Sequence, residues 1–408
     1  MPDGANSDTD AARRTVYLAG AGIAGLTLAL ELAKRGFAVV VLEREPRPSP
    51  LGAGLQLSPN ARLILNRLGL RDALAATAFE PLALDVYPFA RTTPLASLAF
   101  GETVSRRYRA PYTVIHRAGL NEVLLAAARR SSNIEILWSI RRVDLVRHAR
   151  GISMGIELPD RRALNVRPYA YVGADGVWSK TRIDLLDGPD AKFSGYVAWR
   201  ALIAEAQLAG LVPLDRTCLF WGPGFHAVTY PLPAEARLNV ALFTRLSARH
   251  AFALDPPTRP RIDKWYLRRS KVFGELMKIM GDKWTFWPIS TVKTKRWHDG
   301  PVGLIGDAAH AMLPFQAQGA AMAIEDAAVL ASELAATDTP ESAFAAFEAR
   351  RRKRVERVRA LSQRNGRVFH LSWPFSQARN LAVINRAADA HLAELDWLYG
   401  FDAAAGEG

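Results

Sequence analysis

The sequence predicts an α/β protein in which a Rossmann-like domain is interleaved with an antiparallel β-sheet domain and followed by C-terminal helices. Three observations support this fold class. A glycine-rich turn joins an apolar strand to a helix near the start of the chain. Two later strands each end at a glycine and an aspartate, and between them lies a stretch of short alternating segments bounded by turn residues.

Length and composition limit the possible classes of protein. The chain has 408 residues, which is enough for two domains, and a formal net charge of +13. Its single cysteine, Cys218, cannot form an internal disulfide or a cysteine-based zinc site, and we expect no metal. The positive charge suits anionic ligands, but the arginines are scattered and no nucleic-acid-binding motif occurs. We expect the densest basic run, 350–359, to be a solvated helix face.

The first residues are not expected to direct the chain to a membrane. Residues 1–13 are predicted to be a disordered tail, because they are acidic and rich in turn formers. Residues 16–33 are nearly uncharged, but three glycines and Glu31 interrupt them, and no basic segment precedes them. We therefore expect neither a signal peptide nor a membrane span, and a cytoplasmic location.

Residues 15–45, TVYLAGAGIAGLTLALELAKRGFAVVVLERE, predict a dinucleotide-binding βαβ unit. Gly20 would make the tight turn, Gly22 would let a pyrophosphate approach the backbone, and Gly25 would let helix and strand pack closely. Glu43 follows about 20 residues later, where an acidic side chain accepts hydrogen bonds from a ribose. The motif alone leaves NAD and FAD as alternatives.

Two later segments repeat the pattern of a strand ending at a turn. A strand predicted at residues 169–172 ends at a turn, 173–176, that contains Asp175. A second apolar strand ends at Gly306-Asp307. Because parallel strands present their carboxyl ends at one edge of a sheet, we expect these ends to meet on one extended ligand. The alternative for Asp307 alone is a helix N-cap. His310, nearby, is expected to be structural, satisfied by backbone hydrogen bonds.

The middle of the chain, 195–246, predicts an antiparallel sheet. Its period of two puts His226, Val228 and Tyr230 on one face, and the four residues from His226 to Tyr230 span about 13 Å. At this separation, the His226 and Tyr230 side chains could contact a bound ring from opposite ends. Arg200 could pair with a carboxylate or face solvent, and Trp199 could line an aromatic pocket or fill the core.

Three motifs taken together carry a resemblance: GAGIAGL with Glu43, GADGVWSKTR, and GDAAHAMLPFQAQGAAMAIEDA. Over roughly residues 14–385 the chain resembles the single-component FAD-dependent aromatic hydroxylases, the p-hydroxybenzoate hydroxylase-like family, most of all its salicylate, 3-hydroxybenzoate and 6-hydroxynicotinate hydroxylase branch. The resemblance implies FAD as cofactor, NADH or NADPH as transient electron donor, and O2. It also implies hydroxylation of a small hydroxylated, carboxylated aromatic or N-heteroaromatic compound through a flavin hydroperoxide. A second glycine motif for the donor is absent here, as it is in the family.

The resemblance also assigns roles to individual residues. The residues implied to bind FAD are Gly20, Gly22, Ile23, Ala24, Gly25, Glu43, Arg44, Gln56, Arg117, Asp175, Asp307, Pro314, Gln318, Gly319 and Ala320. The residues implied to contact substrate are Trp199, Arg200, His226 and Tyr230. His226 would be the base that deprotonates the substrate hydroxyl, with Tyr230 beside it, and Pro314 would lie along the reacting part of the flavin.

The expected domains interleave along the chain. The FAD-binding domain is expected to comprise 14–80, 101–190 and 285–335, the substrate domain 81–100 and 191–284, and the C-terminal helices 336–408. The protein would be a monomer or a homodimer. The alternatives are another flavin enzyme of the same fold, such as an epoxidase or halogenase, a flavin-bound interaction protein without catalysis, and a DNA-binding protein.

Overall fold

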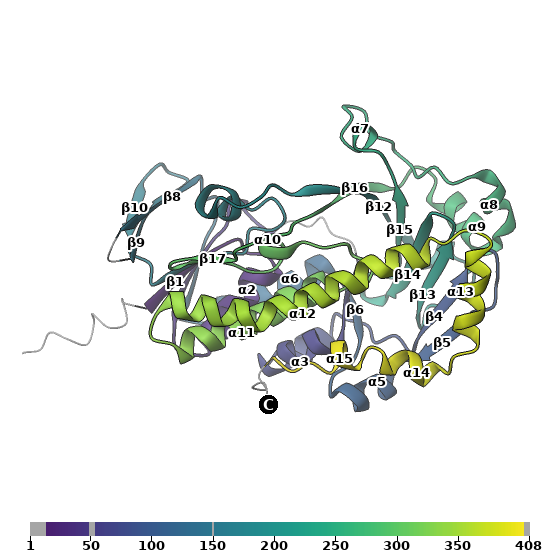
Figure 1. The fold of residues 1–408 in the computed structure, drawn as a ribbon, viewed down its shortest axis with the longest axis horizontal. Coiled ribbons are helices and arrows are strands. Elements are labelled where there is room, and N and C mark those ends of the chain that lie inside the picture. Colours follow the sequence, from purple (N-terminus) through teal and green to yellow (C-terminus); the bar gives the residue numbers. More distant parts are fainter. Residues whose placement is uncertain (1–13, 49–53, 149–150, 404–408) are drawn as a thin grey trace, which may run out of the picture.

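The computed structural model describes residues 14–48, 54–148 and 151–403. The tail expected at 1–13 lies outside the described residues. Two large sheets lie at opposite ends of the molecule, and long C-terminal helices run between them (Figure 1). The predicted α/β class, with one mainly parallel and one mainly antiparallel sheet, is confirmed.

The six-stranded sheet is parallel except at β17, and β1 lies inside it between β2 and β11. Its strands in spatial order are β17 (His298–Asp299), β18 (Val302–Leu304), β11 (Ala170–Gly173), β1 (Thr15–Ala19), β2 (Ala38–Leu42) and β7 (Ile134–Leu137). The three apolar runs that end at the predicted turns thus lie side by side, with β11 between β1 and β18. The carboxyl ends of β1, β11 and β18 lie at one edge, where such sheets bind ligands.

The seven-stranded sheet is antiparallel except for the pair β4–β13. Its strands in spatial order are β16 (Thr285–Thr291), β12 (Lys192–Ala204), β15 (Arg237–Arg245), β14 (Phe225–Leu232), β13 (Thr217–Gly222), β4 (Ala83–Pro88) and β5 (Ala96–Ala99). The range 285–335 was expected in the FAD-binding domain. It begins with β16, which pairs with β12 and so belongs to this second sheet.

Smaller elements fill the space around the two sheets. The short strands are β3 (Gly54–Leu57) paired with β6 (Thr113–His116), and a sheet of β8 (Arg142–His148), β9 (Gly151–Glu157) and β10 (Ala163–Val166). The helices before residue 300 are α2 (Ile23–Ala33), α3 (Pro59–Arg67), α4 (Arg71–Ala75), α5 (Gly101–Tyr108), α6 (Arg117–Arg129), α7 (Ala248–Ala251), α8 (Lys264–Arg269) and α9 (Lys271–Met280). α3 has Ser58 at its N-cap and Pro59 at its first position, two residue types that favour a helix start.

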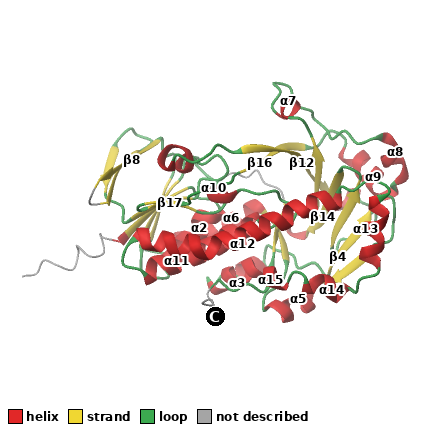
Figure 2. Ribbon diagram, in the orientation of Figure 1, coloured by secondary structure: helices red, strands yellow, loops and turns green. Residues whose placement is uncertain are grey.

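From residue 307 to the end of the described chain at 403, the regular elements are all helices (Figure 2). Their helices are α10 (Asp307–His310), α11 (Gly319–Ala336), α12 (Pro340–Phe369), α13 (Phe375–Ile384), α14 (Ala388–Ala393) and α15 (Asp396–Tyr399). α11 packs on α2 and α3, and α12 packs on α11 and then extends toward the seven-stranded sheet. Within the described ranges, no helix has the length and apolar character needed to cross a membrane.

The basic run 350–359 is not simply a solvated helix face, and that expectation was wrong for two of its arginines. Arg351 is fully buried: its Nε donates to Asp326 Oδ1 at 2.8 Å, and its Nη1 lies 2.6 Å from Glu325 Oε2. Arg354 holds both oxygens of Glu325 at 2.7 Å. Two adjacent buried carboxylates on α11 require these cations, because unpaired charges are very costly to bury.

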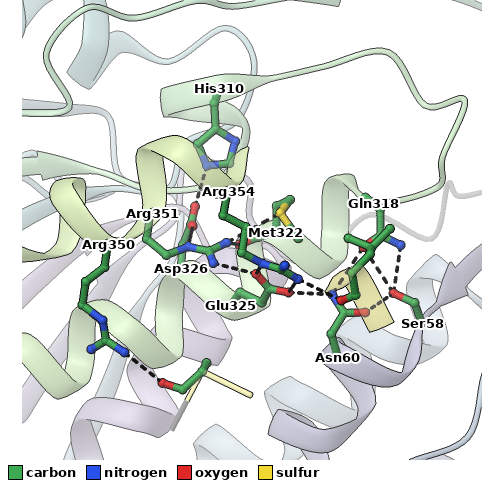
Figure 3. A network of polar contacts seen from close by, with 12 residues as sticks. Ser58, Asn60, His310, Gln318, Met322, Glu325, Asp326, Arg350, Arg351 and Arg354 are labelled. Atoms are coloured by element: carbon green, nitrogen blue, oxygen red, sulfur yellow. Dashed lines mark hydrogen bonds and ion pairs between the residues drawn. The ribbon is translucent and has the colours of Figure 1, made fainter. Parts of the chain in front are cut away.

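Other polar groups complete this charge cluster (Figure 3). His310 Nε2 lies 2.6 Å from Asp326 Oδ2, and Asn60 Nδ2 donates to Glu325 Oε1 at 2.6 Å. His310 is therefore structural, but its partner is a carboxylate rather than the backbone. Burial alone would raise the pKa of Asp326, yet His310 and Arg351 lower it to about 2. Both carboxylates thus stay ionised at neutral pH and join α3, α10, α11 and α12.

Replacing Arg351 by methionine should lower the free energy of unfolding by about 3–5 kcal/mol, because two buried carboxylates lose their shared cation. Arg350→Met is the matched control on the same helix. Arg350 pairs with Glu333 at 2.6 Å near the surface, where a salt bridge contributes at most about 1 kcal/mol. Urea unfolding of the FAD-loaded variants measures both values. Equal losses for the two variants would contradict the importance of the buried cluster.

Candidate active site

One cavity of about 490 Å³ lies between the two sheets and brings together motifs that are distant in sequence. One wall is the end of the glycine-rich turn, Gly22, together with the first residues of α2, Ile23 and Ala24. Asp307 and the start of α11 form a second wall. The opposite wall is the face of the seven-stranded sheet that carries His226 and Tyr230.

The glycine-rich turn has the close approaches that the motif predicts. Gly20 has φ +104°, and a Cβ there would lie 2.7 Å from the Ala174 carbonyl oxygen. A Cβ on Gly25 would lie 2.0 Å from the Gly20 carbonyl oxygen, so only glycine lets the helix pack on the turn. At Gly22, a Cβ would meet no protein atom within 4 Å. The backbone at Gly22 is therefore open to a ligand.

Glu43 is bonded to this turn. Its Oε2 accepts from the backbone N–H of Ala21 at 2.7 Å, and its Oε1 accepts from that of Glu45 at 3.0 Å. The acid therefore fixes the shape of the glycine turn at the carboxyl end of β2. Arg44, next in sequence, is exposed and pairs with Glu45 at 3.3 Å. Neither Glu43 nor Arg44 lines the cavity, although both were predicted to bind the cofactor.

The two aspartates at the other strand ends differ in environment. Asp175 Oδ2 accepts from the backbone N–H and the hydroxyl of Thr181, both at 3.0 Å. Its Oδ1 is buried and has no hydrogen-bond partner among the described residues. Asp307 is exposed toward the cavity at the first position of α10, and Gly306, not Asp307, occupies the N-cap. Asp307 therefore presents its carboxylate to the cavity, whereas Asp175, which was also predicted to bind the cofactor, does not line it.

The predicted cofactor residues in the loop before α11 and at its first turn do not all face the cavity. Pro314, Gly319 and Ala320 line the cavity, and the amino end of α11 presents unpaired N–H groups there. Gln318 does not line it: its Nε2 donates to Ser58 Oγ at 2.9 Å (Figure 3). The side chain of this predicted cofactor residue instead holds the loop against α3.

The face of the seven-stranded sheet toward the cavity follows the period of two that the sequence predicts. His226, Val228 and Tyr230 all line the cavity, and the aligned positions on neighbouring strands are mostly apolar. Tyr230 is buried near Gln56, which lies on β3 and also lines the cavity. Trp199 is on the other face, where it packs on Phe286 with ring centroids 4.9 Å apart. Trp199 is therefore a core residue and not part of the pocket wall.

Arg200 reaches the cavity from β12, and among the described residues its buried Nε has no hydrogen-bond partner. Burial lowers its pKa, the nearby Tyr230 opposes this, and the positive charge of Arg117 lowers it further. Arg117 also lines the cavity, at the first position of α6. A half-buried guanidinium that faces a cavity and keeps an unused donor is suited to an anionic group of a ligand.

Sequence reasoning missed the partner of His226. His226 Nδ1 lies 2.7 Å from His370 Nε2, and His370 follows the last residue of α12. His226 is 1% exposed and stacks on Phe243 with ring centroids 4.6 Å apart. Burial, and then the neighbouring His370, hold the pKa of His226 well below its usual value. His226 is therefore neutral at physiological pH.

The C-terminal helices also line the cavity. The lining residues from this part of the chain are Leu361, Arg364, Asn365, Phe369, Val383, His391, Glu394, Leu395 and Tyr399. Among the residues that the structure describes, no group of three or more His, Cys, Asp or Glu is placed to hold a metal ion.

Comparisons with known proteins agree with this site. Residues 13–362 match the family described as FAD binding domain, and the chain belongs to that family. It is 32% identical over 404 residues to 3-amino-4-hydroxybenzoate 2-monooxygenase PtmB3 of Streptomyces platensis, covering 96% of this chain and 97% of that protein. It is 30% identical over 388 residues to 3-hydroxybenzoate 6-hydroxylase 1 of Aquipseudomonas alcaligenes, covering 94% and 97%.

A solved structure shares the fold. Klebsiella pneumoniae HpxO complexed with FAD and uric acid superposes with a TM-score of 0.76 at 22% identity, covering 95% of this chain and 96% of that one. The predicted class is confirmed: the chain is an FAD-dependent aromatic hydroxylase.

The residues present fit FAD. The open space over Gly22 and the cavity-facing carboxylate of Asp307 provide a backbone surface and an acceptor at the carboxyl ends of β1 and β18. A dinucleotide needs backbone contact at its pyrophosphate and acceptors for its hydroxyl groups. We propose that these residues, together with the amino end of α11, hold FAD.

Asp307→Ala should leave a folded protein that binds FAD about 30-fold more weakly, since a charged hydrogen-bond acceptor contributes about 2 kcal/mol. Equilibrium titration of the apoprotein with FAD, followed by flavin fluorescence, measures the change. Asp338→Ala, at an exposed aspartate between α11 and α12, is the control and should bind FAD normally. Unchanged FAD affinity in Asp307→Ala would contradict the assigned role.

Proposed function

We propose that the protein is an NAD(P)H-dependent monooxygenase that hydroxylates a small hydroxylated and carboxylated aromatic or N-heteroaromatic compound. The observation that carries this proposal is the shared cavity, in which Asp307 and Gly319 face the sheet that bears Arg200, His226 and Tyr230. Both curated relatives are named for hydroxylated benzoates. The cavity volume, about 490 Å³, is in the range of small-molecule sites.

The proposed reaction consumes the aromatic compound, O2, NAD(P)H and one proton, and yields the hydroxylated compound, water and NAD(P)+. FAD, when bound and reduced by the nicotinamide donor, supplies an electrophilic oxygen atom derived from O2. One C–H bond of the ring is replaced by C–OH, and the second oxygen atom leaves as water. The residues of the chain bind and orient the ring, exclude water and move the proton of the substrate hydroxyl.

His226 is the proposed proton acceptor. A phenol attacks an electrophilic oxygen poorly and a phenolate attacks it well, so removal of the hydroxyl proton activates the ring. Because its pKa is held well below the usual value by burial and by His370, His226 is unprotonated at neutral pH and can accept a hydrogen bond from the substrate hydroxyl. Tyr230 lies on the same face two positions beyond Val228, so the pair can bracket one ring.

Arg200 is the proposed partner of the substrate carboxylate. Its half-buried guanidinium has an unused Nε donor at the cavity, and a carboxylate matches the planar fork of arginine. The walls around His226 are apolar and aromatic, with Phe243 and Phe315 against its ring. The cavity therefore combines a cation for one substituent, a neutral base for another and an apolar surface for the ring.

The test of the proposal starts with the absorbance spectrum of the purified protein. NADH and NADPH oxidation is then followed with hydroxybenzoates and hydroxypyridines, and with benzoate as a compound that lacks the hydroxyl. The proposal expects flavin absorbance and oxidation that one hydroxylated acid stimulates, with one hydroxylated product formed. Flavin absorbance without stimulation by any of these compounds would contradict the proposed substrate class, and failure to take up FAD would contradict the cofactor.

His226→Ala should retain NAD(P)H oxidation but form about tenfold less product per NAD(P)H, the balance appearing as H2O2, since a general base contributes at least about 100-fold to the step it serves. Chromatography and a peroxide assay measure the ratio. In the unmodified protein, the low pKa of His226 predicts that coupling persists as the pH falls through about 6.5 and is lost only at lower pH. His298→Ala, at a histidine paired with Glu348, is the control.

Arg200→Leu should raise the KM for the carboxylated substrate about 30-fold, which corresponds to about 2 kcal/mol for a lost charged contact, with a smaller effect on kcat. The matching phenol without a carboxylate should show less than about a threefold change in KM. Steady-state kinetics with both compounds separate the two cases. An equal rise for both would mean that Arg200 does not bind the carboxylate.

A further inference from the structure

The hydrogen bond between His226 and His370 joins the substrate face to the end of α12. His226 Nδ1 and His370 Nε2 are 2.7 Å apart, and the two ring centroids are 5.0 Å apart. A second contact reinforces the pair, because the Gly224 N–H donates to the His370 carbonyl oxygen at 3.1 Å. His370 therefore contacts the turn before β14 through its backbone and β14 itself through its side chain.

The proton of this hydrogen bond couples the states of the two rings. A neutral imidazole carries one N–H, so either His226 donates from Nδ1 or His370 donates from Nε2. In the first case His226 Nε2 is bare and can accept a proton from a ligand in the cavity. In the second case Nε2 carries the hydrogen, and His226 can only donate. The role of His226 therefore depends on which ring donates.

The surroundings of the pair keep it uncharged. The charged groups that act on His370 from neighbouring elements are Arg245 of β15 and Arg379 of α13, and both are cations. Burial and these two arginines lower the pKa of His370 to about 4. Tyr196 of β12, Phe315 and Phe369 cover the rest with aromatic rings. Unlike a carboxylate, which would stabilise a charged partner, His370 offers a neutral acceptor.

We propose that His370 is the positioning residue of the reaction: it accepts the Nδ1 hydrogen of His226 and so leaves Nε2 bare toward the substrate hydroxyl. This inference rests on the proposed role of His226 as base. His370 lies 144 residues from His226 in sequence. In this role it fixes both the plane of the His226 imidazole and its tautomer. A partner that selects the tautomer of a base in this way is a recurrent device in enzymes.

In the proposed step, protons move only among the substrate, His226 and His370. The substrate O–H bond breaks, its proton binds His226 Nε2, and the Nδ1–H can shift to His370 Nε2, so the positive charge is shared by two rings. The substrate keeps the electron pair as a phenolate. When the product regains a neutral hydroxyl, the proton returns by the reverse path. Arg245 and Arg379 favour that return, because cations destabilise a protonated pair.

The direct test is 15N NMR of the FAD-loaded protein labelled at histidine, with the His226 signals assigned by their loss in His226→Ala. We expect a protonated Nδ1 and a bare Nε2 in the unmodified protein. His370→Phe, which keeps a ring without an acceptor, should shift the hydrogen of His226 toward Nε2. His370→Gln, whose side-chain oxygen can replace the acceptor, should restore Nδ1–H at least in part. A protonated Nε2 in the unmodified protein would overturn the proposal, whether or not the variants fold.

The coupling of NAD(P)H oxidation to product formation can also be measured in these variants. Product formed per NAD(P)H should fall about tenfold in His370→Phe and recover in His370→Gln, since loss of an orienting partner typically costs about 10–100-fold. His250→Phe, at an exposed histidine on α7, is the control for the substitution itself. If His226→Ala does not uncouple, the proposed base fails. If His226→Ala uncouples while His370→Phe changes neither coupling nor tautomer, only the role of His370 fails.

Discussion

Two adjacent buried carboxylates, Glu325 and Asp326, impose the main constraint on this molecule. Neither can be buried alone, so α12 must supply Arg351 and Arg354 at the height on α11 where these carboxylates lie. The same α11 begins at Gly319, which forms part of the cavity wall. The electrostatic requirement of the core therefore sets the position of the cofactor site relative to the C-terminal helices.

The cavity has two chemically distinct ends that come from two different sheets. The end at the six-stranded sheet is made of backbone groups and the Asp307 carboxylate, which suits phosphates and hydroxyl groups. The end at the seven-stranded sheet is apolar, with a neutral histidine and one guanidinium. The C-terminal helices close the space between them, so neither sheet forms the complete site by itself.

Local sequence patterns predicted the parts of this site that depend on short stretches of chain. The glycine turn and the period of two around His226 each follow from a few neighbouring residues, and the structure shows both of them. The contacts of Arg351 and His370 could not be predicted in this way. A basic run at helical spacing is usual for a solvated face, and no local pattern indicates that a carboxylate on another helix will be buried against it. His370 meets His226 only after both sheets and α12 have formed.

The length of α12 has a further consequence, because one helix carries both Arg351 and the residue that follows its last turn, His370. These two positions are separated by about 28 Å along a helix with a rise of 1.5 Å per residue. Loss or gain of a single residue between them would rotate one end relative to the other by about 100°. The charge cluster would then stay in place while His370 turned away from His226. The helix thus sets a fixed register between the two ends of the cavity, and its length should resist change more strongly than the identity of its exposed residues.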